Sequence, residues 1–226
     1  SRLVTASLAA SDFTANSGTL LDNYNLPTSA TGLGTIDPRA LTAAIIGNPT
    51  KIYDGTTAAT LASGNYQLTG FIAGEGASVT ETAGSYDSKN AGPRTVTAML
   101  DAADFTANSG TLLDNYILPT SASGAGTISQ KLLTALIIGL PTKVYDATTG
   151  ATLTSSNFAL SGFVTGEGAT VTETAGTYGS PDAGIRIITA ALDGGDFSAN
   201  GGTLLSNYVL PTRATGAGII EKATLY

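Results

Sequence analysis

The 226-residue chain contains no cysteine, no histidine and no tryptophan. Without cysteine, no disulfide, zinc–thiolate site or thiol nucleophile can form. Without histidine as well, the most common general bases and transition-metal ligands are missing. An enzyme built from this sequence would have to work with carboxylates and hydroxyl groups. We therefore predict that the protein is not an enzyme and that it carries no cofactor.

Charged residues are also scarce, at 12% of the chain, about half of their usual share in globular proteins. The net charge of −7 is spread along the sequence. No cluster of lysine and arginine is present to neutralise phosphates, which argues against a nucleic-acid partner. No apolar run reaches the roughly 18 residues of a transmembrane helix, and no basic segment followed by an apolar one forms a signal peptide. We expect no membrane insertion by this segment, and any anchor or signal to lie elsewhere.

Small uncharged residues take the place of the missing charges. Threonine, serine, alanine and glycine at alternating positions suit the solvent face of β-strands, where threonine is favoured and no long side chain has to be ordered. The hydrophobic share of 42% is sufficient for buried cores. The absence of cysteine also suits a chain that is exported unfolded, since no disulfide can form prematurely. The composition therefore predicts an all-β protein and favours export.

One passage occurs three times at a constant spacing. Residues 12–24 recur at 104–116 and, slightly altered, at 196–208, a step of 92 residues each time. A second passage, 49–57, returns after the same step at 141–149. Repeats that cannot fold alone usually have about 20 to 50 residues, whereas this unit is close to the size of an independent domain. We predict a tandem array of compact domains.

The repeat divides the chain into four segments. Residues 39–130 (unit 1) and 131–222 (unit 2) are complete repeats, residues 1–38 (the N-terminal segment) correspond to the last part of a repeat, and residues 223–226 begin another. We therefore expect further copies on either side. The units are joined without a Gly/Ser-rich linker, which restricts the angle between them and favours an elongated, stiff rod.

Each unit is predicted to contain six to eight short strands and no long helix. Residues 73–76 have the length of a hairpin link between two of these strands. Asp54 and Gly55 form a tight turn, and because Ala147 replaces the glycine in unit 2, we expect that no strictly positive φ is required there. In unit 1 the expected strands are 41–46, 50–53, 66–71, 77–82, 94–100 and 126–128.

Many polar and aromatic residues recur at the same step, as structural residues of a repeat must. We expect the recurrent aspartates to cap turns and the lysines to lie near acidic neighbours. Recurrent arginines at positions 2, 94 and 186 are expected to pair with a carboxylate. The main structural candidates are Lys51, Tyr53, Asp54, Asn115, Tyr116, Lys143, Tyr145, Asp146, Asn207 and Tyr208.

A sharper hypothesis concerns the lysines and asparagines. Lys51 or Lys143 would form an intramolecular amide with a recurrent asparagine such as Asn115 or Asn207, assisted by a buried glutamate. The sequence shows the required residue types but not their proximity.

Two kinds of carboxylate site were also weighed. Asp101, Asp104, Asp193 and Asp196 are weak candidates for calcium, but the chain has no Asp-x-Asp-x-Asp-Gly loop, so we favour solvated turn aspartates and no metal site. Glutamates at 75, 81, 167 and 173 offer carboxylate pairs of the kind that glycosidases use. A catalytic site repeated in every unit of an array is rarely useful, and we therefore expect these glutamates to be structural.

The recurrent aromatics allow two interpretations. Phenylalanines at 13, 105 and 197, and tyrosines at 24, 116 and 208, would stack on sugars if they were exposed. In a unit with few large residues we expect them to form the core instead, since each can bury about 150 Å² or more.

Four motifs follow one another in unit 1: Lys51-Ile-Tyr-Asp-Gly-Thr-Thr57, Asn90-Ala-Gly92 before the strand 95–97, Asp114-Asn-Tyr-Ile-Leu118 and Gly126-Thr-Ile128. Their order resembles the YDG and MBG repeats of large bacterial surface adhesins. The resemblance covers both complete units and the partial one. It implies compact β-grasp-like or β-sandwich domains that serve as stalk modules of exported proteins of the filamentous-haemagglutinin type, at the bacterial cell surface.

Three functions follow from these observations. The first is a structural stalk that projects a distant binding region and contacts mainly neighbouring repeats of the same chain. The second is a multivalent module that binds host or matrix glycans or proteins. The third is a subunit of a self-assembling extracellular filament, in which the N-terminal segment pairs its open strand edges with another chain.

Overall fold

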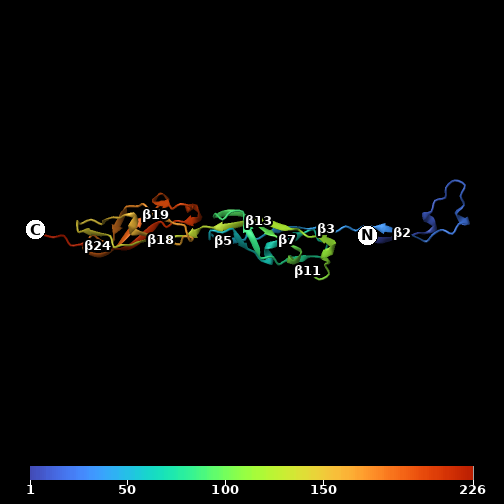
Figure 1. Ribbon diagram of the computed structural model, residues 1–226, viewed down its shortest axis with the longest axis horizontal. Helices are drawn as coiled ribbons and strands as arrows, with labels where there is room; N and C mark the ends of the chain where they lie inside the picture. The colour runs from blue at the N-terminus through green and yellow to red at the C-terminus, as the bar shows by residue number, and fades with distance from the viewer. Residues whose placement is uncertain (226) are drawn as a thin grey trace.

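The computed structural model describes residues 1–225, so Tyr226 at the end of the segment 223–226 lies outside the described residues. These residues form β-strands, single 3-10 turns and loops, with no α-helix and therefore no helix that would cross a membrane. The predicted all-β class is confirmed. Figure 1 shows units 1 and 2 one after the other along the longest axis, with the N-terminal segment beyond unit 1, at the end away from unit 2.

Seven strands of unit 1 form one mixed sheet. Its order is β6-β9-β10-β13-β4-β7, and β5 pairs with β13 beside β4. The central strands β10 and β13 are antiparallel, whereas β4 and β5 both run parallel to β13. Two small ladders, β8–β11 and β3–β12, flank the sheet. The bounds are β3 Arg39–Ala40, β4 Thr42–Ile45, β5 Thr50–Ile52, β6 Ala58–Thr60, β7 Tyr66–Thr69, β8 Ala77–Val79, β9 Ala83–Tyr86, β10 Gly92–Met99, β11 Phe105–Ala107, β12 Tyr116–Ile117 and β13 Ser121–Ser129.

Unit 2 repeats this arrangement. Its sheet has the order β17-β20-β21-β24-β15-β18, with β16 paired to β24, and its ladders are β19–β22 and β14–β23. Arg186 lies opposite Gly218 in β21–β24, as Arg94 lies opposite Gly126 in β10–β13. The bounds are β14 Lys131–Leu132, β15 Thr134–Ile137, β16 Thr142–Val144, β17 Gly150–Thr152, β18 Phe158–Ser161, β19 Ala169–Val171, β20 Ala175–Tyr178, β21 Gly184–Ala191, β22 Phe197–Ala199, β23 Tyr208–Val209 and β24 Arg213–Glu221.

The N-terminal segment keeps the central hairpin of the repeat. Its strands β1 (Arg2–Ser7) and β2 (Ser29–Gly34) pair antiparallel in the same register as β10 and β13. Val4 is 56% exposed, whereas Val96, at the same position of unit 1, is fully buried. The 3-10 turns of the chain are η1 Ala10–Asp12, η2 Leu21–Asn23, η3 Ser63–Asn65, η4 Ala102–Asp104, η5 Leu113–Asn115, η6 Ser155–Asn157, η7 Gly194–Asp196 and η8 Leu205–Asn207.

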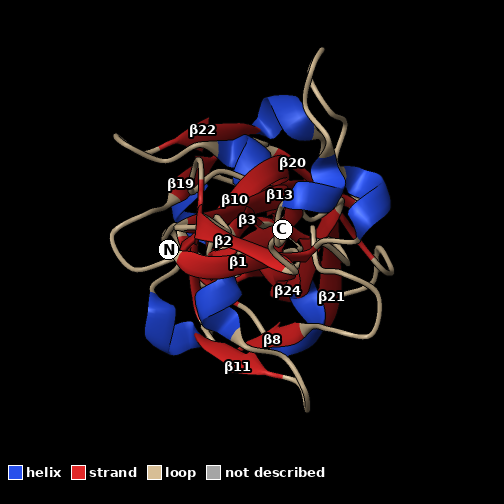
Figure 2. Cartoon of the chain, turned by 90° about the vertical axis from the view of Figure 1, so that its right-hand side faces the viewer, coloured by secondary structure: helices blue, strands red, loops and turns tan. Residues whose placement is uncertain are grey.

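Successive units are turned relative to one another about the long axis. Figure 2, a view along that axis, shows the central strands of both units near the middle. The ladder β8–β11 of unit 1 and the ladder β19–β22 of unit 2 lie on opposite sides of it, as they also do in Figure 1. Equivalent faces of the two units therefore point in different directions.

Each core covers one face of its sheet. In β10, Val96 and Ala98 are buried, and the residues beside them in the strand are exposed, as the period of two requires. A glycine in β13 lets β4 approach closely, since a Cβ at Gly124 would lie 1.9 Å from the carbonyl oxygen of Ile45. Gly216 has the same role in unit 2, where the distance to the Ile137 oxygen would be 2.0 Å.

Three local predictions are wrong. Each unit contains eleven strands and not six to eight. Residues 73–76 do not close a hairpin, because β7 pairs with β4 while β8 pairs with β11. The turn after Asp54 does require a positive φ, which is 80° at Gly55 and 64° at Ala147. In both units the aspartate side chain accepts a hydrogen bond from the amide two residues further on, and this closes the turn around a left-handed residue.

Candidate inter-unit docking site

A lysine and an aspartate fix the loop between β5 and β6. The Lys51 ammonium donates to Asp54 Oδ1 and to the carbonyl oxygen of Thr56, both at 2.8 Å. Asp54 Oδ1 also accepts from the Thr56 amide at 2.9 Å. Burial would raise the pKa of Asp54, but the hydrogen bonds from Lys51 and Thr56 hold it below its ordinary value. Tyr53 lies between Lys51 and Asp54 in the sequence. The hydrogen bonds of these two residues make the loop a rigid support for Tyr53.

Unit 2 contains the same loop. Lys143 donates to the carbonyl oxygen of Thr148 at 3.0 Å and forms an ion pair of 2.6 Å with Asp146. The hydrogen bond from Lys143 lowers the pKa of Asp146 to about 2. Tyr145 takes the place of Tyr53 in this loop.

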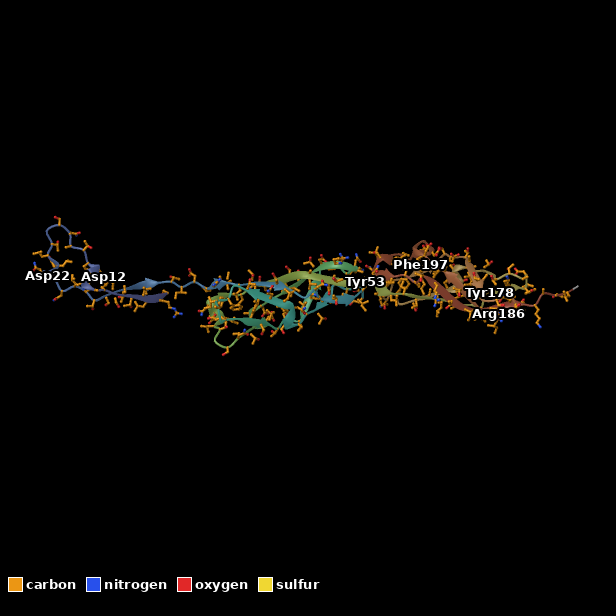
Figure 3. The ribbon with its side chains drawn as sticks, turned by 180° about the vertical axis from the view of Figure 1, so that it is seen from behind. Asp12, Asp22, Tyr53, Tyr178, Arg186 and Phe197 are labelled. Carbon is orange, nitrogen blue, oxygen red and sulfur yellow. The ribbon has the colours of Figure 1, made fainter. Side chains whose placement is uncertain are left out.

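Tyr53 lies at the end of unit 1 and contacts unit 2 (Figure 3). Its hydroxyl donates to Glu167 Oε1 at 2.6 Å, and the other oxygen of the same carboxylate accepts from the Tyr208 hydroxyl at 2.7 Å. The rings of Tyr53 and Tyr208 meet edge to face, with centroids 5.4 Å apart. Only 1% of the Tyr53 surface is exposed. One glutamate of unit 2 therefore binds a tyrosine from each unit.

The environment of Tyr53 favours its neutral form. Burial, followed by the hydrogen bond to Glu167 and the charge of that carboxylate, raises the pKa of Tyr53 to about 12. Burial and the bond to the same glutamate also raise the pKa of Tyr208. The hydroxyl donors of the site thus stay protonated far above neutral pH.

A second contact is made by Asn207, which is 1% exposed. Its Oδ1 accepts from the Ala91 amide at 2.8 Å, and its Nδ2 donates to Asn90 Oδ1 at 3.2 Å. The loop of unit 1 that provides these partners is held by Arg94, which donates to the carbonyl oxygens of Asn90 and Ala91 at 2.7 and 2.9 Å. The predicted pairing of this arginine with a carboxylate is wrong, since it binds backbone carbonyls, as Arg186 does in unit 2.

The connection between the units is part of the same contact. Gln130 donates to the carbonyl oxygen of Ser206 at 3.0 Å, and β14 begins at Lys131 and pairs with β23 of unit 2. Leu133 is 1% exposed and belongs to a continuous buried cluster with Tyr208 and the core residues of unit 1. The hydrophobic core of unit 1 therefore continues into unit 2.

The acceptor side of the contact is also present in unit 1. Glu75 Oε2 accepts from the Tyr116 hydroxyl at 2.6 Å, and the ring of Phe71 packs edge to face against Tyr116 at 4.8 Å. Asn115 occupies the position of Asn207 but is exposed. We call the glutamate, asparagine and tyrosine at this end of a unit the head surface, and the loops of Tyr53 and of Asn90–Ala91, or their counterparts, the tail surface.

Other predicted residues have local roles. Asp101 accepts from the Ala103 amide and Asp104 accepts from the Asp101 amide, so both cap η4. Asp193 and Asp196 do the same for η7. Among residues 1–225 no three acidic side chains gather at a point where they would hold a metal ion. The weaker alternative, a calcium site at these aspartates, stays untested.

The structure does not bring the lysines and asparagines of the amide hypothesis together. Lys143 contacts Asp146 and Thr148 of its own loop, while the side chain of Asn207 contacts unit 1. The contacts of Lys143 and Asn207 therefore give no support to the amide hypothesis.

The recurrent glutamates have two different roles. Glu81 accepts from the Ala83 amide at 2.6 Å, as Glu173 does from Ala175, and each supports its own turn. Glu75 and Glu167 bind tyrosines instead.

The recurrent aromatics of the complete units are buried. Phe105 and Phe197 are each 7% exposed, and Tyr116 and Tyr208 are 7% and 2% exposed. Tyr24 of the N-terminal segment is 63% exposed.

Sequence reasoning missed the partner of Tyr53. The signal was present, because the Gly-Glu-Gly turns at 74–76 and 166–168 recur at the step of the repeat.

The comparisons with known proteins identify the domain. The family model of the YDG domain matches the chain twice, at residues 37–124 and 129–216. No curated protein and no solved structure matches the chain. The two matched ranges cover most of the sequence and contain the Lys-Tyr-Asp loops and the Gly-Glu-Gly turns described above. The chain therefore belongs to the YDG domain family.

Proposed function

We propose that this chain is a structural stalk of an extracellular bacterial adhesin or surface fibre. Its YDG repeats would act as a stiff rod that projects a distant binding region. The observation that carries the proposal is the contact between the units, in which Tyr53 and Tyr208 share the carboxylate of Glu167. A spacer needs joints that resist bending, and this joint combines hydrogen bonds, aromatic packing and a shared core.

The joint restricts motion because it acts at several separate points. Asn207 binds one loop of unit 1, Glu167 binds another, and Gln130 fixes the connection itself. Only Gln130 separates the end of β13 from the start of β14. Relative domain motion is the ordinary expectation for small polar interfaces between domains. A continuous buried cluster across the joint argues for the opposite behaviour here.

The surface location is supported by the resemblance to the repeats of large adhesins and by the absence of cysteine. The rod shape is supported by units that follow one another along a single axis. For the fold type we propose β-grasp-like domains. A β-sandwich is built from two antiparallel sheets, whereas each unit here has one large mixed sheet.

Two alternatives have less support. A glycan-binding module would expose aromatics in every unit. Among residues 1–225 the exposed large aromatics are Tyr24 and Tyr145, and the tyrosines at the same positions of unit 1 are buried. Strand addition has one specific observation in its favour, since β1 and β2 pair only with each other within the described chain. Leu33 in β2 and Ile36 just beyond it are 82% and 80% exposed. This hairpin is where a filament contact would form.

Small-angle scattering together with light scattering over a range of concentrations tests the proposal. A spacer is expected to stay monomeric and to give an elongated profile of one well-defined length at all concentrations. A compact or broadly distributed profile would contradict the stiff stalk. Growth into longer assemblies with concentration would favour the filament instead.

A further inference from the structure

Unit 2 carries a complete tail surface at the end away from unit 1. Lys143, Asp146 and Thr148 hold the Tyr145 loop as their counterparts hold the Tyr53 loop. Arg186 donates to the carbonyl oxygens of Asp182 and Ala183 at 3.0 and 3.1 Å, as Arg94 does one repeat earlier. The Tyr145 loop and the Asp182–Ala183 loop are therefore held by hydrogen bonds like those that position the contact residues of unit 1.

The contact residues themselves are exposed on this tail surface. Tyr145 is 42% exposed, whereas Tyr53 is 1% exposed in the joint. Leu225 is 96% exposed, whereas Leu133, at the same position one repeat earlier, is 1% exposed. The same two side chains that are buried in the joint thus face solvent at this end.

We propose that the tail surface of unit 2, formed by Tyr145, Asp182 and Ala183, binds the head surface of another YDG unit that follows it in the same chain. The Tyr145 hydroxyl donates to the Gly-Glu-Gly glutamate of that unit, and the Ala183 amide donates to its head asparagine. This inference rests on the proposed function, because it makes the joint a repeating element of the stalk.

One difference between the tail surfaces of units 1 and 2 restricts which residue the partner's head surface can carry. Asp182 stands where Asn90 accepts from the side-chain amide of Asn207. A carboxylate accepts hydrogen bonds but does not donate them, so it fits an asparagine amide and makes the bond charge-assisted. An aspartate at the head position would be repelled. The partner is therefore expected to carry a side chain there that both accepts and donates, as Asn115 and Asn207 of this chain do.

The partner is a unit joined in sequence and not a second molecule. In the joint, β14 continues directly from β13 and pairs with β23, so the connection takes part in the contact. In a second copy, residues 36–38 of the same chain already lie beside Asn115, in the place that the connection 128–130 takes beside Ser206 in the joint. The connection of another molecule therefore finds this place at the head of unit 1 already taken.

The test compares two full chains. One is the present chain, and in the other a second copy of residues 131–222 follows Lys222. Backbone amide hydrogen exchange at Ala183 is measured in both, because the equivalent Ala91 amide is bonded in the joint. We expect exchange at Ala183 to slow by about tenfold or more in the longer chain. The substitution Tyr145→Phe should reverse most of this protection in the longer chain and leave the present chain unchanged.

Three outcomes would overturn the inference. The first is equal exchange at Ala183 in the two chains, and the second is protection that does not respond to Tyr145→Phe. The third is protection in the present chain that grows with its concentration, which would mean docking between molecules. The first two can occur while scattering still shows a stiff monomer, so the stalk proposal fails or stands separately from this inference.

Discussion

The substitution Tyr53→Phe removes one hydroxyl from the joint and leaves its ring in place. The hydroxyl is buried and donates to the carboxylate of Glu167 at 2.6 Å. Hydrogen bonds to charged groups contribute roughly 1.5–3 kcal/mol. The packing of the ring against Tyr208 should persist. We therefore expect the joint to open more often by a factor of about 10 to 150.

Exchange of the Ala91 amide reports this opening, since that amide donates across the joint to Asn207. Tyr145→Phe is the matched control, because Tyr145 sits in the same loop of unit 2 and takes no part in the joint between units 1 and 2. Its effect on Ala91 should be negligible. A double-mutant cycle with Glu167→Gln isolates the pair and should show strong coupling. Equal effects of Tyr53→Phe and Tyr145→Phe on Ala91, or additive effects in the cycle, would refute the reasoning.

Further predictions concern single positions. Ala147→Gly should stabilise unit 2 by about 0.5–1 kcal/mol in chemical denaturation, because relief of a left-handed alanine exceeds the added chain entropy; lower stability would contradict the observed φ. Tyr66→Phe should be neutral or stabilising by up to about 1 kcal/mol, since its buried hydroxyl finds no partner within residues 1–225 and unit 2 has phenylalanine there; clear destabilisation would imply an unseen partner. Gly124→Ala should destabilise unit 1 by about 3 kcal/mol or more through overlap with the Ile45 carbonyl; a change below about 1 kcal/mol would mean that β4 moves easily. Because the pKa of Tyr53 is raised to about 12, its contribution to the joint should be complete below about pH 10 and lost as the pH rises through about 12; a joint that loosens near neutral pH would argue against this tyrosine.

Local patterns predicted some of the strands and missed others, such as β6, β9 and β11. The alternation in residues 94–100 gave β10, and the run 50–53 gave β5. They failed where a distant part of the chain decides the outcome. The link 73–76 is short enough for a hairpin, but β8 is taken by β11, which lies almost thirty residues later. The φ of Ala147 is set by the cap from Asp146, which overrides the ordinary preference of alanine.

The docking site was the least predictable feature. Tyr53 and Glu167 belong to different units, and the recurrence of both residues shows that they are structural without showing that they meet. The same holds for Asn207. Its recurrence suggested an amide bond to a lysine, whereas its side chain binds the Asn90–Ala91 loop of unit 1. A repeat identifies the residues of a joint, but the pairing across it depends on how the units are turned.

The central claim is that the joint holds units 1 and 2 in one orientation. The chain has no cysteine, so Thr97→Cys together with Thr189→Cys gives two unique sites for spin labels. Both positions are exposed, and they are equivalent in the two units. The distance distribution between the labels, measured by pulsed electron paramagnetic resonance, should be a single narrow peak that broadens when Tyr53→Phe and Asn207→Ala are added. A broad distribution in the otherwise unchanged chain would contradict the account.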